Sequence, residues 1–356
     1  MNTMYDYYLE QPGVLNDIFS NRASAAKAFV ESFGRERPDR LYLIASGSSL
    51  NAALAAEAFM ELALGIEVRC SAPSSLPAIR GEWPFILFIS QGGSSTNTIA
   101  AIKALSAYPM LALTGAEACR INELCAHSLI PCGPELAGPK TKGYTATALT
   151  LMMMALEAGR AAGTVCEAAY GDMTAHFASA LVRAEEGVAS VTEWYRRNES
   201  TLSDMENCVV VGKGTGAQAA REAALKIQET LLLSVCGYEF EEFLHGPSMA
   251  LNATTGGFYL MPPKSDPDYT RMAALALFHR TISPSVYMIG GGDELTDGRD
   301  CAVGHGDAWY TRVFTWVLPC QVTGALLSLR KGLEGKGSQL FRELDNALNI
   351  KYKPQA

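Results

Sequence analysis

Short apolar runs alternate along this chain with stretches of helical periodicity, and this alternation limits the possible folds more than any other feature. In the first half, apolar runs occupy residues 41–45, 85–89, 110–113 and 128–130, with a weaker one at 67–69. Continuous apolar runs are typical of strands buried on both faces, and strands separated by helices form parallel sheets. The sequence therefore predicts an α/β protein.

The same order of elements returns in the second half. Residues 208–211 form an apolar run that leads through a glycine-rich turn into a helix, and further runs lie near 258–261 and 286–289. An uncharged helical stretch closes each half, at 145–156 and at 313–329. We therefore predict two copies of one α/β unit.

The pattern also predicts how the chain is divided, beginning with an amphipathic helix over residues 13–33. The last segment is polar and is either a frayed end or a short segment folded over a site. The expected divisions are an N-terminal helical segment (1–34), a first domain (35–163), a connecting helix (164–200), a second domain (201–340) and a C-terminal tail near the active site (341–356).

Composition excludes several classes of protein. A net charge of −8 argues against a nucleic-acid surface. The nine cysteines are odd in number and contain no C-x-x-C pair, which indicates reduced thiols in a cytoplasmic protein. The N-terminus lacks the pattern of a signal peptide. Residues 313–329 are short for a membrane span and contain Pro319, so a buried core helix is predicted there instead.

Two serine-rich turns follow apolar runs of the first half. One is Ser46–Ser49, which includes Gly47, and the other is Ser90–Ser95. Ligands of parallel α/β sheets bind at the carboxyl ends of the strands, where a following helix presents free N–H groups that suit an anion. Helix capping by serine is the simpler alternative. The presence of two such turns in one predicted sheet favours a phosphate site.

One helical face in the second half carries charge in an apolar setting. Glu222, Lys226 and Glu229 are spaced i, i+4 and i+7, and His245 follows in a Gly-Pro turn. A surface ion pair is the ordinary explanation of this spacing. However, the helix is apolar around most of its circumference, which predicts burial, and buried charges usually serve a function. The histidines show no metal-ligand spacing, and no metal is expected.

The stretch 212–217 fits the dinucleotide pattern G-x-G-x-x-A after a strand. A dinucleotide site also needs an acidic residue at the end of the next strand. Here the helix is predicted to continue past Leu233, so we interpret the stretch as a tight strand-to-helix turn and expect no cofactor.

These residues resemble the double SIS (sugar isomerase) domain family, in particular the isomerase half of glucosamine-6-phosphate synthase and the stand-alone fructosamine- and glucoselysine-6-phosphate deglycases. The resemblance runs from about Asp39 to the C-terminus. Its most specific parts are E-A-A-L-K-I-Q-E (222–229) and E-F-L-H-G-P (242–247), and the stretches 90–98 and 135–145 also fit. The family fold implies that each unit is a flavodoxin-like parallel five-stranded sheet flanked by helices.

The resemblance also implies roles for individual residues. Those that would hold the phosphosugar are Ser49, Ser90, Gln91, Ser95 and Thr98, together with Gly47 in the first turn.

For the chemistry, the resemblance implies that Glu229 is the base at the C1 and C2 carbons, with Lys226 and Glu222 beside it. His245 matches a histidine that assists ring opening and reaches the site of another subunit, which implies a homodimer or a larger homo-oligomer. A lysine of the tail contacts the sugar in the synthase. Its counterpart here is Lys351 or Lys353, and the sequence leaves this choice open.

The chain also departs from the synthase. Gly92 and Ser94 replace a hydroxyl and a carboxylate of its S-x-S-G-E-T turn, and Lys140 stands in place of a serine. A cation at Lys140 is suited to the carboxylate of an amino-acid-bearing substrate. The glutamine-hydrolysing domain and its N-terminal cysteine are not found, so we expect no glutaminase activity.

We therefore expect an enzyme that acts on an aminated or amino-acid-linked 6-phosphosugar, as a deglycase or deaminase with isomerase-type proton transfer and no cofactor. The alternatives are a simple aldose–ketose phosphosugar isomerase and a non-catalytic phosphosugar sensor. A sensor can lose the glutamate and the histidine, and both are present here.

Overall fold

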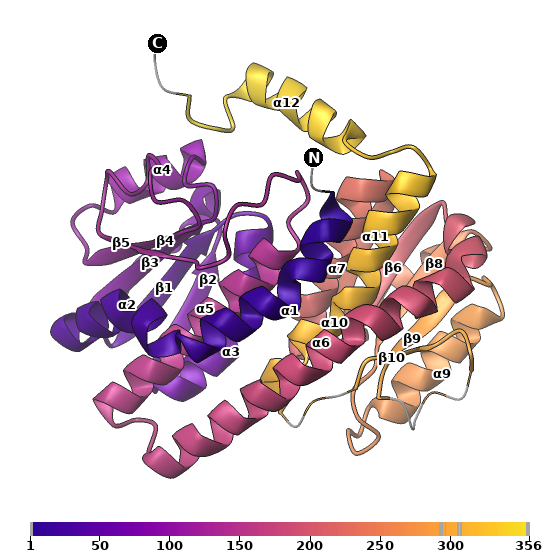
Figure 1. Cartoon of the computed structure of the whole chain (residues 1–356), viewed down its shortest axis with the longest axis horizontal. Coiled ribbons are helices and arrows are strands. Elements are labelled where there is room, and N and C mark those ends of the chain that lie inside the picture. Colours follow the sequence, from indigo (N-terminus) through magenta and orange to yellow (C-terminus); the bar gives the residue numbers. More distant parts are fainter. Residues whose placement is uncertain (1–2, 292–294, 296, 305, 307, 354–356) are drawn as a thin grey trace. The chain divides into compact units, whose positions relative to one another are not determined.

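The computed structural model describes residues 3–291, 295, 297–304, 306 and 308–353 (Figure 1). The chain divides into two compact units, each built around one sheet. The first-sheet unit comprises Gly13–Leu136, Lys142–Ala175 and Gln339–Ala356, and the second-sheet unit comprises Met1–Pro12, Ala137–Thr141 and His176–Ser338. The domain limits expected from the sequence stay a prediction.

The first sheet is parallel, with the order β2-β1-β3-β4-β5. Its strands are β1 (Arg40–Ala45), β2 (Glu67–Ser71), β3 (Pro84–Ser90), β4 (Met110–Thr114) and β5 (His127–Leu129). The helices of this unit are α2 (Arg22–Glu36), α3 (Ser48–Leu64), α4 (Thr96–Ala104) and α5 (Lys142–Ala162).

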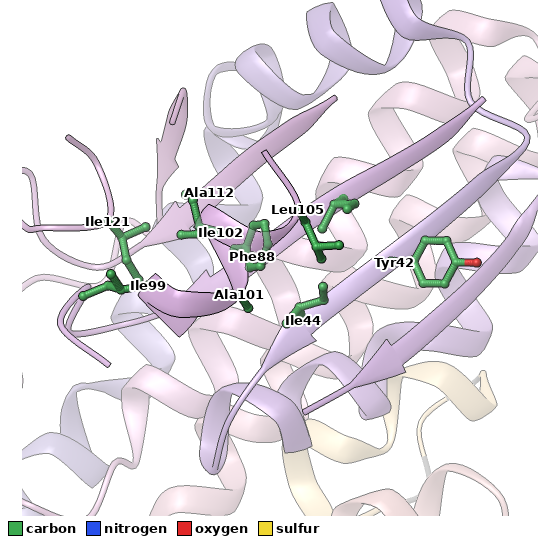
Figure 2. Packing of buried hydrophobic residues seen from close by; sticks show 10 residues of the cluster. Tyr42, Ile44, Phe88, Ile99, Ala101, Ile102, Leu105, Ala112 and Ile121 are labelled. Atoms are coloured by element: carbon green, nitrogen blue, oxygen red, sulfur yellow. The ribbon is translucent and has the colours of Figure 1, made fainter. Parts of the chain in front are cut away.

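Alternation of side chains along the strands buries both faces of this sheet. Tyr42, Ile44 and Phe88 point to the face that α4 covers, where they pack with Ile99 and Ile102 (Figure 2). The residues between them along each strand point to the opposite face, as expected from the two-residue period of a strand. The helices α2 and α3 pack against α5. Burial on both faces explains why the strands are continuous apolar runs.

The second sheet repeats this arrangement. Its order is β10-β9-β8-β6-β7, again parallel, which is the first sheet's order when each sheet is counted from its own first strand. Its strands are β6 (Asn207–Gly212), β7 (Ser234–Glu239), β8 (Thr255–Leu260), β9 (Val286–Gly290) and β10 (Cys301–Ala302). The prediction of two flavodoxin-like, five-stranded parallel sheets is confirmed.

Helices of the second-sheet unit include α7 (Thr215–Leu231), α8 (Phe240–Leu244), α9 (Tyr269–Arg280), α10 (Val313–Trp316) and α11 (Leu318–Arg330). Three further helices carry the chain across unit boundaries in the sequence: α1 (Met4–Ser20), α6 (Glu167–Ser203) and α12 (Lys336–Leu348).

Two predicted helices are broken. The stretch 13–33 belongs to α1 and α2, which separate at Asn21, whose side-chain amide and backbone N–H both donate to the Asp17 carbonyl. The stretch 313–329 belongs to α10 and α11. Pro319 lies in the first turn of α11, where its ring and missing N–H prevent an uninterrupted helix.

The predicted extension of the helix past Leu233 is wrong. Helix α7 ends at Leu231 because Leu232 adopts a left-handed φ of 58°, and β7 follows. Strand β7 lies at the edge of the sheet and buries little beyond Val235, so it shows no apolar run in the sequence. The short strand β10, at the other edge, was missed for the same reason.

One helical stretch, Trp309–Arg330, has the length and hydropathy of a membrane span. Inside the protein, 83% of its most apolar window is buried, which is the environment of a core helix. This matches the interpretation of residues 313–329 from the sequence.

Candidate active site

The turn after β1 brings serine hydroxyls to the carboxyl end of the first sheet. Gly47 caps α3 with a φ of 58°, a left-handed conformation that favours glycine. Ser48 and Ser49 then form the first turn of α3 and are partly buried. The side chain of Asn97, from α4, donates to the Ser46 Oγ at 3.1 Å. Asn97 therefore connects this turn to the next one.

The turn after β3 has the same relation to α4. Ser90 ends the strand and is 6% exposed, Ser95 caps α4, and Thr98 is buried in the first turn. The Gly93 N–H donates to the Ser90 carbonyl at 3.0 Å, which closes the turn. Because β1 and β3 are neighbouring parallel strands, the two serine turns lie side by side at the carboxyl ends of the strands.

Gln91 points into the first-sheet unit. Its Nε2 donates to the Cys132 Sγ at 3.4 Å. A Cβ atom at Gly143 would lie 2.0 Å from that same nitrogen, so the first turn of α5 accommodates the amide only because residue 143 is glycine. The predicted phosphosugar residue Gln91 is therefore held by packing as well as by a hydrogen bond.

The C-terminal tail pairs with the second serine turn. Ser95 and Lys351 form an antiparallel bridge, and the Lys351 Nζ donates to the Ser95 Oγ at 3.1 Å. Burial lowers the pKa of Lys351, an effect that Asp345 partly offsets. Lys353 instead lies 3.3 Å from an Asp345 carboxylate oxygen. Of the two candidate lysines, Lys351 is the one that the structure brings to the serine turn.

In the second-sheet unit, α7 carries the charged face expected from the sequence. Lys226 and Glu222 have no exposed side-chain surface, whereas Glu229 keeps 37% of its side chain exposed. The Lys226 Nζ lies 2.6 Å from the Glu229 Oε2 and 3.3 Å from the Glu222 Oε1. Burial by itself lowers the pKa of Lys226, but the two carboxylates outweigh burial and raise it above the ordinary 10.5. Lys226 therefore remains an ammonium ion.

His245 directly follows α8 as its C-cap residue, and it is exposed. Glu239 fixes the start of this helix, because its carboxylate accepts the N–H groups of Glu241 and Glu242 at 2.7 and 3.1 Å. Gly246, with a φ of 145°, then turns the chain into a 3-10 helix at Pro247–Ala250. This places the imidazole on the surface of the unit.

Lys140 lies in the segment Ala137–Thr141, which belongs to the second-sheet unit. Its Nζ donates to the Ala137 carbonyl at 2.8 Å. The ammonium group therefore helps to fold its own loop.

The glycine-rich turn after β6 needs a corrected explanation. An acidic residue does end the following strand, since β7 ends at Glu239, but that carboxylate caps α8. Lys213, inside the turn, lies 2.8 Å from Asp266 and 2.7 Å from Asp268. The Glu239 carboxylate and the Lys213 ammonium group are thus both bonded to other groups of the protein. We therefore keep the interpretation of this stretch as a tight strand-to-helix turn.

Two contributors were missed from the sequence. Asn97 could have been noticed, because asparagine at the start of a helix commonly bonds nearby groups through its side chain. Asp345, which holds the tail, gives no sequence signal. Within the described ranges, no group of three or more His, Cys, Asp or Glu side chains is arranged to hold a metal ion. All nine cysteines lie in the described part of the chain and are unpaired.

Comparison with known proteins places these features in context. No family model matches the chain. The chain is 25% identical, over 349 residues, to the isomerizing glutamine–fructose-6-phosphate aminotransferase of Streptococcus agalactiae serotype V. The match covers 93% of this chain and 57% of that protein, so the chain spans little more than half the length of this relative.

Two solved structures have the same architecture. A protein of Clostridium difficile 630, assigned as a phosphosugar isomerase, superposes with a TM-score of 0.84 at 25% identity, covering 94% of this chain and 95% of that one. The C-terminal domain of the glucosamine-fructose-6-phosphate aminotransferase of Francisella tularensis superposes with a TM-score of 0.81, covering 93% and 96%. At 16% identity, the second likeness supports the fold alone.

Proposed function

The chain is a double SIS-domain protein that resembles the isomerase domain of the glutamine–fructose-6-phosphate aminotransferases, and on this basis we propose that it is an enzyme acting on a 6-phosphosugar. The proposed substrate carries an amine or an amino acid, and the reaction is a deglycation or deamination with isomerase-type proton transfer. The observation that carries this proposal is the α7 cluster, in which a fully buried ammonium group lies beside a partly exposed carboxylate.

The serine turns supply the proposed phosphate site. Hydroxyl groups and helix N–H groups donate to an anion without adding bulk, and glycine lets the ligand approach the backbone. Fixing the phosphate lets binding energy position the reacting carbons. The residues assigned to this role are Gly47, Ser49, Ser90, Gln91, Ser95 and Thr98.

Glu229 is the proposed base. It takes a proton from the carbon next to the carbonyl or imine, whose double bond accepts the electron pair and gives an enediol or enamine. Glu229 then returns the proton to the neighbouring carbon. When the shift produces an imine at the carbon that bears nitrogen, water hydrolyses it and releases the amine. The carbonyl or imine acts as the electron sink, so this scheme assigns no step to a cofactor.

Lys226 is proposed to act as a cation. Because its pKa is raised, it stays protonated across the ordinary range of pH and is a poor nucleophile. Its charge, 2.6 Å from Glu229, can stabilise the negative charge that develops during proton transfer. Glu222 balances this charge inside the unit, which keeps Lys226 in place.

His245 is proposed to open the sugar ring by proton transfer in a homodimer or larger homo-oligomer, where it reaches the partner subunit's site. Its exposed side chain supports this role. Lys351, against Ser95, is proposed to contact the sugar, and Lys140 to pair with a carboxylate of the substrate.

A binding and product assay tests the proposal. The purified protein is exposed to the 6-phosphates of fructose, glucosamine, fructoselysine, glucoselysine and fructose-asparagine, each with its unphosphorylated control, while thermal unfolding and released products are followed. Stabilisation with release of an amine or amino acid is the expected result. Aldose–ketose exchange without release would replace the proposal with simple isomerase activity, and stabilisation without turnover by any member would favour a sensor.

A further inference from the structure

The C-terminal tail depends on a carboxylate that has no place in the chemistry above. Helix α12 ends at Leu348, and Asn349 reverses the chain with a φ of 52° while its N–H donates to the Asp345 carbonyl at 2.8 Å. The tail then returns along the turn that precedes α4. This reversal brings Lys351 alongside Ser95.

Asp345 holds the reversed chain through its side chain. Its Oδ1 accepts the backbone N–H of Lys351 at 2.6 Å, and its Oδ2 lies 3.3 Å from the Lys353 Nζ. The bond from the Lys351 backbone is the main reason that the pKa of Asp345 is lowered, so the carboxylate is ionised at neutral pH. Only 12% of this side chain is exposed, although it lies near the end of the chain.

Further backbone bonds join the tail to the serine turn and to the first residue of α4. The Thr96 N–H donates to the Ile350 carbonyl at 3.1 Å, and the Tyr352 N–H donates to the Ser94 carbonyl at 2.7 Å. These bonds flank the bridge between Ser95 and Lys351. The Lys351 N–H points away from that pairing to Asp345, so the carboxylate and the serine turn hold opposite sides of one short strand.

We propose that Asp345 is a positioning residue, which fixes the strand after α12 and so holds the Lys351 ammonium group against the Ser95 hydroxyl. The effect of Asp345 on catalysis rests on the proposed function, in which Lys351 contacts the sugar. Asp345 itself contacts no reacting atom and acts through Lys351. If Asp345 has this role, mutating it has no further effect on activity once Lys351 has been removed. A residue that only stabilises the unit would still lower activity in the absence of Lys351.

A double-mutant cycle on the full chain tests this distinction. We expect Asp345→Ala to lower kcat by about tenfold, as for a misplaced catalytic group, with a smaller change in KM. Lys351→Met alone and the double variant should lose activity to the same extent. Glu343→Ala, which removes an exposed carboxylate from the same helix, is the matched control and should behave as wild type. Multiplicative losses in the double variant would overturn the proposal.

A second readout does not need turnover. Brief acetylation with an N-hydroxysuccinimide ester, followed by peptide mass spectrometry, measures the reactivity of each lysine, which depends on its accessibility and on its protonation. Asp345→Asn is therefore the reference, because it removes the charge that raises the pKa of Lys351 but keeps a side-chain oxygen that can accept the Lys351 N–H. We expect Lys351 to react several-fold faster in Asp345→Ala than in Asp345→Asn, while Lys103, on α4, reacts at the same rate in both. Equal labelling of Lys351 in the two variants would overturn the positioning role. If labelling changes but wild type turns over no phosphosugar, the positioning role stands and the proposed function fails.

Discussion

The two sheets share a backbone plan but differ in the side chains at equivalent turns. Gly47 after β1 and Gly214 after β6 have nearly the same left-handed φ, 58° and 57°, and each caps the helix that follows. In the first sheet the adjacent groups are serine hydroxyls. In the second sheet, Lys213 is bonded to Asp266 and Asp268, which follow β8.

This difference shows what a shared fold does and does not provide. Both sheets offer the carboxyl ends of two neighbouring strands, the position at which α/β sheets bind ligands. In the second sheet, the carboxylates of Asp266 and Asp268 pair with Lys213, and their negative charge repels an incoming anion. The same topology thus presents serine hydroxyls, the proposed phosphate ligands, at one sheet and an internal ion pair at the other, because the side chains set the charge.

The largest effect is expected from Glu229→Gln, because it removes the proposed base and keeps its shape. We predict a fall in kcat of about 10²- to 10⁴-fold, the usual contribution of general acid–base catalysis, with phosphosugar affinity nearly unchanged. Steady-state kinetics and calorimetric binding measure the two quantities. Glu206→Gln, the same change at an exposed site in the same unit, is the control. A variant with wild-type turnover would show that Glu229 is not the base.

The next effect compares two cations of the second-sheet unit, the buried Lys226 and the partly exposed Lys213. Lys226→Met should lower the free energy of unfolding by about 3–5 kcal/mol, because the buried Glu222 carboxylate loses the ammonium group that lies 3.3 Å from it. Lys213→Met should cost only about 0–1 kcal/mol, because that pair is partly hydrated. Urea unfolding measures both. Equal losses would mean that burial does not distinguish the two ion-pair sites.

A smaller effect is expected at the serine turns. Ser90→Ala should weaken the binding of a phosphorylated sugar by about 10- to 100-fold, the range for a hydrogen bond to a charged group, and leave unphosphorylated sugar unaffected. Lys213→Gln, at the equivalent end of the other sheet, should change neither affinity. Equal losses for both sugars would rule out a phosphate site at Ser90.

Near neutral pH, the smallest effect is expected from His279, a buried residue of α9 whose Nδ1 lies 3.1 Å from the Tyr259 hydroxyl. Burial lowers its pKa from 6.5 to about 4. The unfolded chain therefore binds a proton that the folded chain does not, and stability falls as the pH drops from about 6.5 to about 4. Urea midpoints across this range should show the fall, and His279→Gln should reduce it. An unchanged profile in the variant would assign the acid sensitivity to other groups.

Much of the fold could be predicted because its signals are local. A strand buried on both faces must be apolar along its length, so β1, β3, β4, β6 and β8 are visible as runs. The edge strands β7 and β10 include exposed residues and show no such run, and they were missed. The spacing of Glu222, Lys226 and Glu229 predicted one helix face, which the structure confirms.

By itself, the sequence determined the two-sheet α/β plan, the serine turns and the shared face of α7, because each depends on residues close together in the chain. Only the tertiary structure decided that Lys351 rather than Lys353 reaches Ser95, and that Asp345 holds it there. The bond between Lys351 and Ser95 joins residues 256 positions apart. No local periodicity encodes such a pairing, because it exists only after the sheet has formed and the tail has docked on its turn.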